Sequence, residues 1–446
     1  MAKRKGTNRK MDRSLPVMRP NAGGIDIGAT EIFVAVPVDR DTESVRSFPS
    51  FTQDLNTLAD WLQQCRVDTV AMESTGVYWI PLFQILEARG IEVHLVNAQH
   101  VHNVPGRKSD VLDCQWLQYL HSVGLLRASF RPEHAICEIR SLMRHRDNLV
   151  QMACVHVQHM QKSLDQMNLQ IHHVISDITG TTGLAILDAI IAGNTDPEEL
   201  AKLRNYRIKA STETITKSLV GDYRAEHIFT LKQSLTAYRH YQQLIADCDG
   251  EIQQRIQSFE TKDGGSASML DQFNSRPKAN FDLRTHFERI FGVDLTRIPG
   301  FDVLRIQTIF SELGADLSAF PTVESFCSWL NLCPKDGTSA GRRIRVYLKT
   351  KNRVTQAFRM AGQSLHNNKS YLGDYYRCQR ARHGGLKAVK NAGHKLARIF
   401  YHVVRTRQPY DETVFAKLEA RNHQRRLHKL ANMAKQMGYS LVLTHA

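Results

Sequence analysis

The order of strand and helix patterns between residues 21 and 135 constrains the fold of this chain most. Apolar residues recur with the period of a strand in five short segments and with the period of a helix in three longer ones. The expected strands are Gly24–Ala29, Glu31–Pro37, Ser44–Ser50, Asp68–Met72 and Ile91–Asn97, and the expected helices are Thr52–Cys65, Val77–Arg89 and Asp110–Leu120. Three consecutive strands followed by alternating helices and strands predict an α/β domain with a mixed sheet.

Four carboxylates occupy particular places in this pattern. Asp26 lies in the first strand, Glu73 follows the fourth strand, and Asp110 and Asp113 lie on the last helix. The element order is that of the RNase H-like fold, in which the first and fourth strands are neighbours, and helix positions i and i+3 share a face. We therefore expect the four acids to meet. Such a set predicts a site for Mg²⁺, with Mn²⁺ as the alternative ion, acting on phosphates.

The positive charge of the chain is concentrated in one stretch. The net charge is +15, and residues 341–410 contain 17 Lys and Arg against one acid, Asp374. Binding to a polyanion is the expectation, because neutralised phosphates release counterions; a merely solvated basic face is the alternative. The candidate nucleic-acid contacts are Arg342, Arg343, Arg345, Lys349, Arg353, Arg377, Arg380 and Lys395.

Several classes of protein are disfavoured. No run of 18 apolar residues occurs, so we expect no membrane span and no membrane partner. The eight cysteines include no CxxC pair, which is typical of reduced thiols in the cytoplasm. We therefore expect a cytoplasmic protein that is associated with the nucleoid. Cys154, His156 and His159 lie in a segment with helical period, which favours a helix face over a zinc site.

The chain divides into several expected parts. Long helical periodicity covers 136–175 and 228–260, and its apolar stripe must be buried, either in a coiled-coil dimer or in a hairpin within one chain. The expected parts are a basic disordered arm at 1–20, the α/β domain at 21–135, a coiled-coil or helical dimerisation region with a linker at 136–283, a mostly α-helical domain at 284–410 and a basic C-terminal tail at 411–446.

Ser339 lies in a short basic loop that is expected after a helix ending at Pro334. On local sequence alone a serine beside glycine is a turn residue, and nothing nearby is an evident base to activate it. Arginines at 342, 343 and 345 are suited to holding a phosphate.

The combination of motifs resembles the DEDD transposases of the insertion-sequence family one-ten, in particular its eleven-eleven subgroup, which are related to the Piv DNA invertases. The resemblance runs from about residue 20 to about residue 405. Its marks are Gly24-Ile-Asp26-Ile-Gly28, Met72-Glu73-Ser-Thr-Gly-Val-Tyr-Trp79, Lys108-Ser-Asp110-x-x-Asp113, Ile298-Pro-Gly300, Leu332-Cys-Pro334, Ser339-x-Gly341 and His394-Lys-Leu-Ala397.

This resemblance implies a RuvC-like N-terminal domain, a coiled-coil segment and a C-terminal transposase domain with a catalytic serine. Asp26, Glu73, Asp110 and Asp113 take the metal-ligand positions, and Ser339 takes the position of a nucleophile that forms a phosphoserine link to DNA. The partners it implies are donor and target DNA, a structured noncoding guide (bridge) RNA that pairs with both, and a homodimer that assembles into a tetramer on DNA.

The sequence departs from the family at two places. Members commonly have Ser-Gly-Gly-Lys where this chain has Ser339-Ala340-Gly341-Arg342, and alanine restricts φ more than glycine does. The Gly-x-Gly-Pro common after the Ile-Pro pair is here Gly300-Phe-Asp-Val303.

Three other functions compete with a transposase. A RuvC-like structure-specific or RNA-guided nuclease would use the same acids with water as the nucleophile. An actin-like sugar kinase shares the motif Gly24–Gly28, yet the second phosphate loop and the adenosine loop are missing from this sequence. An RNA-binding scaffold with an inactive metal site is the non-enzymatic alternative, and the four intact acids disfavour it.

Overall fold

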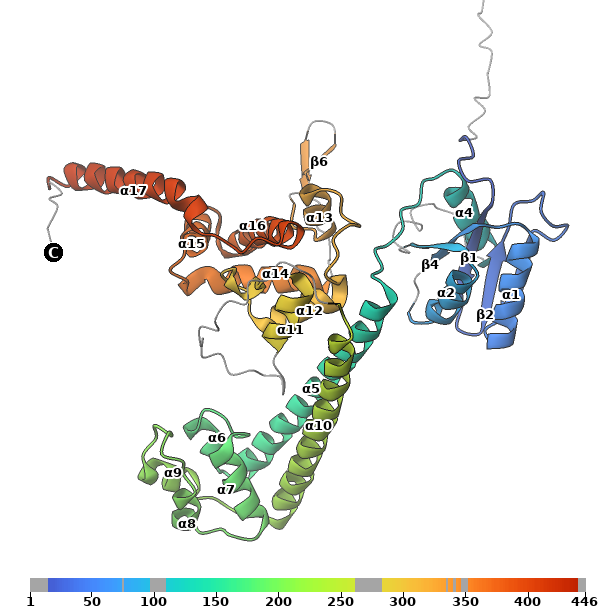
Figure 1. Ribbon diagram of the computed structural model, residues 1–446. Helices are drawn as coiled ribbons and strands as arrows, with labels where there is room; N and C mark the ends of the chain where they lie inside the picture. The colour runs from blue at the N-terminus through green and yellow to red at the C-terminus, as the bar shows by residue number, and fades with distance from the viewer. Residues whose placement is uncertain are drawn as a thin grey trace, which may run out of the picture. The chain divides into compact units, whose positions relative to one another are not determined.

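The computed structural model describes residues 15–73, 76–96, 110–260, 283–333, 336–339, 342–345 and 352–439 (Figure 1). The chain forms two compact units, Met1–Arg131 and Pro132–Ala446, and each is described by itself. Within the described ranges no helix is both long and apolar enough to cross a membrane.

A five-stranded sheet in the order β3-β2-β1-β4-β5 forms the centre of the first unit. β1 is antiparallel to β2, which is antiparallel to β3, whereas β1, β4 and β5 run parallel. The strands are β1 Ala22–Ile27, β2 Glu31–Ala35, β3 Val45–Pro49, β4 Thr69–Glu73 and β5 Glu92–Val96. The predicted element order is confirmed, with bounds within two residues, and so is the pairing of the first and fourth strands.

Helices cover both faces of this sheet. They are α1 Thr52–Gln64, α2 Trp79–Ala88 and α4 Asp110–Ser122. Side chains alternate between the faces of a strand, so Met72 packs in one core with residues of α1 and α2, while Ala71 packs in a second core with Leu117 of α4. The fold class expected for this part, an RNase H-like α/β domain, fits this arrangement.

Residues 15–20 continue this unit, although the sequence predicted a disordered arm there. The backbone amides of Met18 and Arg19 donate to the carbonyl of Ser122 at 2.8 and 2.9 Å. The reason is that these two amides satisfy a carbonyl at the last turn of α4, which would otherwise lack a partner. Residues 1–14 lie outside the described part of the chain.

Two long helices pack against each other in the second unit: α5 His134–Gln166 and α10 Ala225–Gln257 (Figure 1). Their apolar stripes are buried within one chain, as Met160 and Leu164 on α5 and Leu231 and Ile252 on α10 illustrate. Of the two ways to bury the stripe, the chain uses the internal hairpin. Dimerisation through these helices stays a prediction.

Four short helices lie in the connection between α5 and α10: α6 Ile171–Val174, α7 Thr181–Ile191, α8 Pro197–Lys202 and α9 Thr212–Ser218. They share a core with the adjacent ends of α5 and α10. Side-chain caps mark two helix starts, since Asp196 accepts from the amide of Glu198 at 2.9 Å and Ser211 from that of Thr214 at 3.2 Å.

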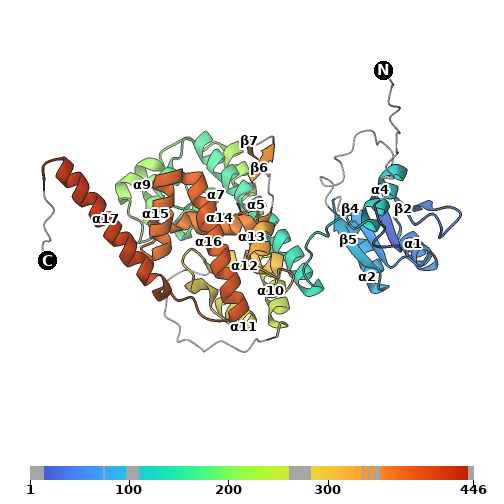
Figure 2. The same cartoon turned by 90° about the horizontal axis from the view of Figure 1, so that it is seen from above.

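The rest of the second unit is mostly helical and is built on aromatic residues. Its helices are α11 Leu283–Phe291, α12 Val303–Leu313, α13 Val323–Trp329, α14 Arg353–Ser364, α15 Tyr371–His383, α16 Gly385–Thr406 and α17 Ala416–Gln436, with short 3-10 turns at Leu295–Arg297, Leu365–Asn367 and Thr413–Phe415. Five phenylalanines are less than 2% exposed and form the core: Phe291, Phe310, Phe326, Phe358 and Phe400. Figure 2 shows α16 beside α14 and α15, against which it packs.

One expectation for this region is wrong. The loop expected around Ser339 is a two-stranded hairpin, β6 Asp336–Ser339 and β7 Arg342–Arg345. The segment expected as a basic tail at 411–446 contains the helix α17. The expected linker at Lys262–Asn280 lies outside the described residues.

Candidate functional site

The register between β1 and β4 places Asp26 and Glu73 next to each other. The parallel pairing runs from Ala22–Thr69 to Ile25–Met72, so the next step along both strands brings Asp26 opposite Glu73. Ile25 and Met72 belong to the core on the α1 and α2 side, so their neighbours Asp26 and Glu73 face the α4 side. Both acids are half-buried. Two carboxylates far apart in sequence thus share one end and one face of the sheet.

Helix α4 lies directly against that face. A Cβ atom on Gly24 would stand 2.2 Å from the carbonyl oxygen of Cys114 and 2.3 Å from the amide nitrogen of Gln118. Only glycine allows the strand and the helix to approach this closely. Gln118 also donates to the backbone carbonyl of Ala22 at 3.1 Å, which fixes the position of the helix along β1.

The electrostatics of Cys114 show how near Asp26 lies to α4. Burial raises the pKa of the Cys114 thiol to about 12, and the negative charges of Asp26 and, more weakly, Asp113 act in the same direction. The effect of Asp26 on this thiol is consistent with a carboxylate that lies close to α4.

The DxxD pair lies on the first turn of α4. Asp110 begins the helix and Asp113 follows one turn later, half-buried. The side chain of Asp110 lies outside the described residues. Since positions i and i+3 share a helix face, the backbone places both acids on one side of α4, at the N-terminal end that a positive helix dipole favours for anions.

A buried histidine anchors the other end of α4, and sequence reasoning missed it. Arg19 donates to Nδ1 of His121 at 3.0 Å, and Nε2 of His121 lies 2.9 Å from the hydroxyl of Thr69. Burial is the largest cause that lowers the pKa of His121 to about 4, and the nearby His94 and Arg19 contribute in the same direction. Because arginine can only donate, neutral His121 carries its proton on Nε2 and donates to Thr69. No sequence motif marks this link between the start of β4 and the end of α4.

Ser339 ends β6 at the turn of the hairpin. The register pairs Ser339 with Arg342 and Asp336 with Arg345, so the backbone of the serine adjoins that of a basic strand. The side chains of this hairpin lie outside the described residues, as does Lys349.

The other predicted nucleic-acid contacts are partly occupied within the protein. Arg353 pairs with Asp147 at 2.6 Å and Arg377 with Asp374 at 2.5 Å. Arg380 donates to the ring of His366 at 3.1 Å. Lys395 lies 4.4 Å from the ring centres of both Tyr371 and Tyr375 and 5.0 Å from that of Phe415. These contacts give each cation a structural role as well.

Other cations are exposed and pair with no acid in the described part of the chain. They lie on α14, α15, α16 and the connection between them: Arg359, Lys369, Arg382 and Lys387. Because no described carboxylate competes for them, they are better suited to contact phosphates than the paired arginines.

Comparison with known proteins assigns the family. Residues 23–169 match the DEDD transposase family of IS110 type, described as a transposase. Residues 294–377 match the family described as transposase IS116/IS110/IS902. No curated protein matches the chain. The first match contains the four acids and the second contains Ser339 and the hairpin. The two matches support placing this chain in the IS110 family of transposases, enzymes that act on DNA in transposition or recombination.

Proposed function

We propose that this transposase cuts and rejoins donor and target DNA at a site where Asp26, Glu73, Asp110 and Asp113 hold Mg²⁺. The adjacency of Asp26 and Glu73 on parallel strands is the observation that carries the proposal. The donor set is made of carboxylates, two from the sheet and two from α4. Such oxygen donors fit a hard cation.

The four acids come from a sheet and a helix that pack closely together. Asp26 and Glu73 come from the sheet, and the DxxD pair comes from α4, which Gly24 allows to lie close above β1. The bound ion supplies charge stabilisation at the phosphate. Elements this tightly packed keep the carboxylates in place without reorganisation.

We propose that Ser339 is the nucleophile. Its Oγ attacks the phosphorus of the scissile phosphodiester, the Oγ–P bond forms, and the bond from phosphorus to the leaving deoxyribose oxygen breaks. The leaving oxygen gains a proton and the serine loses one, so the protein becomes linked to DNA through a phosphodiester. Rejoining is the reverse reaction with another strand, and it needs no ATP.

The neighbourhood of Ser339 supports this role. The hairpin register sets the serine beside a strand with three arginines, Arg342, Arg343 and Arg345. Guanidinium groups bind phosphate in a bidentate fashion and stabilise the negative charge that develops in the transition state. The match of residues 294–377 to a transposase family gives further support.

We also propose that a structured noncoding RNA guides the reaction and that a dimer assembles into a tetramer on DNA. The exposed cations of α14 to α16 support a nucleic-acid surface. Neutralised phosphates would make binding to this surface strongly salt-dependent.

A covalent-trapping experiment tests the nucleophile. Labelled donor DNA, guide RNA, Mg²⁺ and protein are mixed, and the products are separated on a denaturing gel. The wild type should give a protein–DNA adduct that Ser339→Ala abolishes, while Thr338→Ala, a matched control in the same strand, should retain it. If Ser339→Ala still cleaves and rejoins DNA, water is the nucleophile and the nuclease alternative replaces this proposal.

A further inference from the structure

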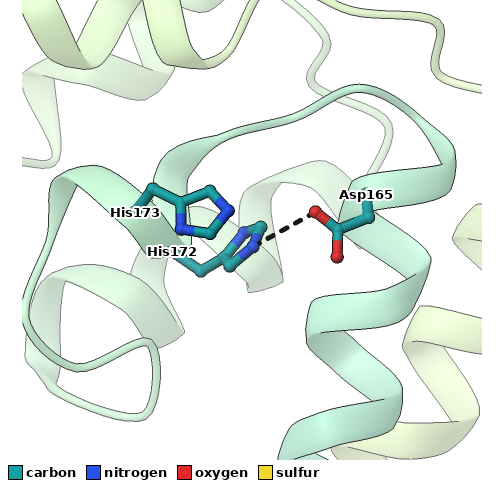
Figure 3. Close-up of side chains that lie close together, drawn as sticks. All are labelled: Asp165, His172 and His173. Atoms are coloured by element: carbon teal, nitrogen blue, oxygen red, sulfur yellow. Dashed lines mark ion pairs between the residues drawn. The ribbon is translucent and has the colours of Figure 1, made fainter.

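Two histidines and an aspartate gather where α5 ends and α6 begins. They are Asp165, His172 and His173, and one potential ligand atom from each lies within 4.8 Å of those of the other two. Figure 3 shows the two imidazole rings next to each other, with the carboxylate of Asp165 directed at the ring of His172. Nε2 of His172 stands 3.2 Å from Oδ1 of Asp165, and the two ring centres are 4.1 Å apart.

The backbone that carries these side chains is firmly held. Met167 and Leu169 are fully buried and Ile171 is 1% exposed, all within the core between α5 and the short helices. The amide of Gln170 donates to the carbonyl of Ser218 at 2.8 Å, which ties the turn to α9. The three side chains therefore project from a fixed frame, as a pre-formed binding site requires.

An ordinary ion pair explains this cluster poorly. The side chain of His172 is 7% exposed, and its buried Nδ1 makes no hydrogen bond of good geometry. The side chain of Asp165 is 53% exposed, and an ion pair with a partner so open to solvent adds little stability. Two imidazole rings and a carboxylate, each with a ligand atom within 4.8 Å of the other two, are a donor set that transition-metal ions take.

We propose that Asp165, His172 and His173 bind a divalent transition-metal ion, with Zn²⁺ as the biological ion. Two nitrogens and one carboxylate oxygen suit zinc, whereas Mg²⁺ prefers oxygen donors alone. Ligands of tetrahedral zinc lie roughly 3–3.5 Å apart, given metal–ligand distances of about 2.0–2.2 Å, and the 3.2 Å between His172 and Asp165 already meets this. Small rotations of the exposed His173 and Asp165 side chains complete the set.

This site is separate from the proposed catalytic acids and has another purpose. The bound ion would link the last turn of α5 to α6. It would thereby stabilise the packing of helices α6 to α9 against α5 and α10. Three protein ligands leave the fourth position of the ion for water or a partner group. The inference does not depend on the chemistry of transposition.

Zinc titration of the full chain tests the proposal. Metal-free protein without an affinity tag is titrated calorimetrically with Zn²⁺ while saturating Mg²⁺ occupies the carboxylate site. His173→Ala and Asp165→Asn should weaken zinc binding by at least about 10–100-fold. His240→Ala, which removes an exposed histidine on α10, should leave the affinity unchanged. Asp26→Asn should also leave it unchanged, which separates this site from the acids of the sheet.

Two further measurements guard against a variant that merely misfolds. His173 is exposed, so its replacement should leave the circular dichroism spectrum unchanged. Hydrogen exchange in residues 167–191 should slow when zinc is added to the wild type and should not respond in His173→Ala. Absence of zinc binding by the wild type, or equal zinc affinity in wild type, His173→Ala and Asp165→Asn, would overturn the proposal.

Discussion

Asp26 and Glu73 occupy matching positions on two parallel strands, one step beyond the pair Ile25–Met72. The alternation of the strands turns both carboxylates to the face that α4 covers. Because the two carboxylates share one end and one face of the sheet, replacing either acid alone tests the proposed metal site.

Replacement of Asp26 by asparagine should reduce strand exchange about a hundredfold or more, because charge stabilisation by a bound ion is worth several kcal/mol. The fold should persist, since the amide has the shape of the carboxylate. The measurement is recombination of a plasmid carrying donor and target sites. Asp68→Asn, just before the start of β4 and at the opposite end from Glu73, is the matched control and should stay active. Full activity of Asp26→Asn would remove this residue from the site.

Gly24→Ala should displace α4 from the sheet, because the new methyl group would lie 2.2 Å from the carbonyl oxygen of Cys114. We expect a loss of about 1–3 kcal/mol in the stability of the first unit, together with loss of activity. Gly23→Ala is the control, since its Cβ would come no nearer than 3.1 Å to any atom, that atom being on the Val70 side chain, with the Val67 side chain at 3.3 Å and the carbonyl oxygen of Ala35 at 3.4 Å. The measurements are thermal unfolding and hydrogen exchange in α4, compared between the wild type, Gly24→Ala and Gly23→Ala.

Acid should loosen the contact between α4 and β4 through His121. Its pKa in the folded protein is about 4, below the ordinary value of 6.5, so the native state binds fewer protons than the unfolded state between these values. The stabilising contribution is complete above pH 6.5 and is lost as the pH falls towards 4, by up to about 3 kcal/mol. Hydrogen exchange in α4 should therefore accelerate over this range.

His121→Gln, which cannot be protonated, should remove most of that pH dependence. His240→Gln, an exposed histidine on α10, should keep the wild-type profile. If the profiles of wild type and His121→Gln coincide, another group titrates in this range.

Charge reversal of Arg382 and Lys387 should weaken binding to DNA of unrelated sequences to a similar extent and should reduce the slope of log affinity against log salt by about two. Both side chains are exposed and make no ion pair with a described residue. Lys232→Glu, on the exposed side of α10, should have little effect. Affinity that survives a ten-fold rise in salt would indicate a solvated basic face instead.

The sequence predicted the strands and helices around Asp26 and Glu73 because buried alternation and helical period are strong local signals. The hairpin at Ser339 was missed, since its strands Asp336–Ser339 and Arg342–Arg345 are short and lack an apolar alternation. The surroundings of Lys395 depend on Phe415, which comes from a segment that composition alone marked as a tail. Contacts between distant segments leave no trace in a local pattern.

The hairpin of α5 and α10 has a consequence for the evolution of such proteins. Arg140 and Arg144, near the start of α5, bond to Glu312 of α12, and Arg289 of α11 donates to the carbonyl of Ile256, near the end of α10. The pair of helices α5 and α10 thus leaves and rejoins the C-terminal helices of the second unit at one place. Paired insertions or deletions of whole helical turns in α5 and α10 could lengthen or shorten this pair while the C-terminal helices keep their packing. Natural selection could then change the length of the pair independently of the cutting chemistry.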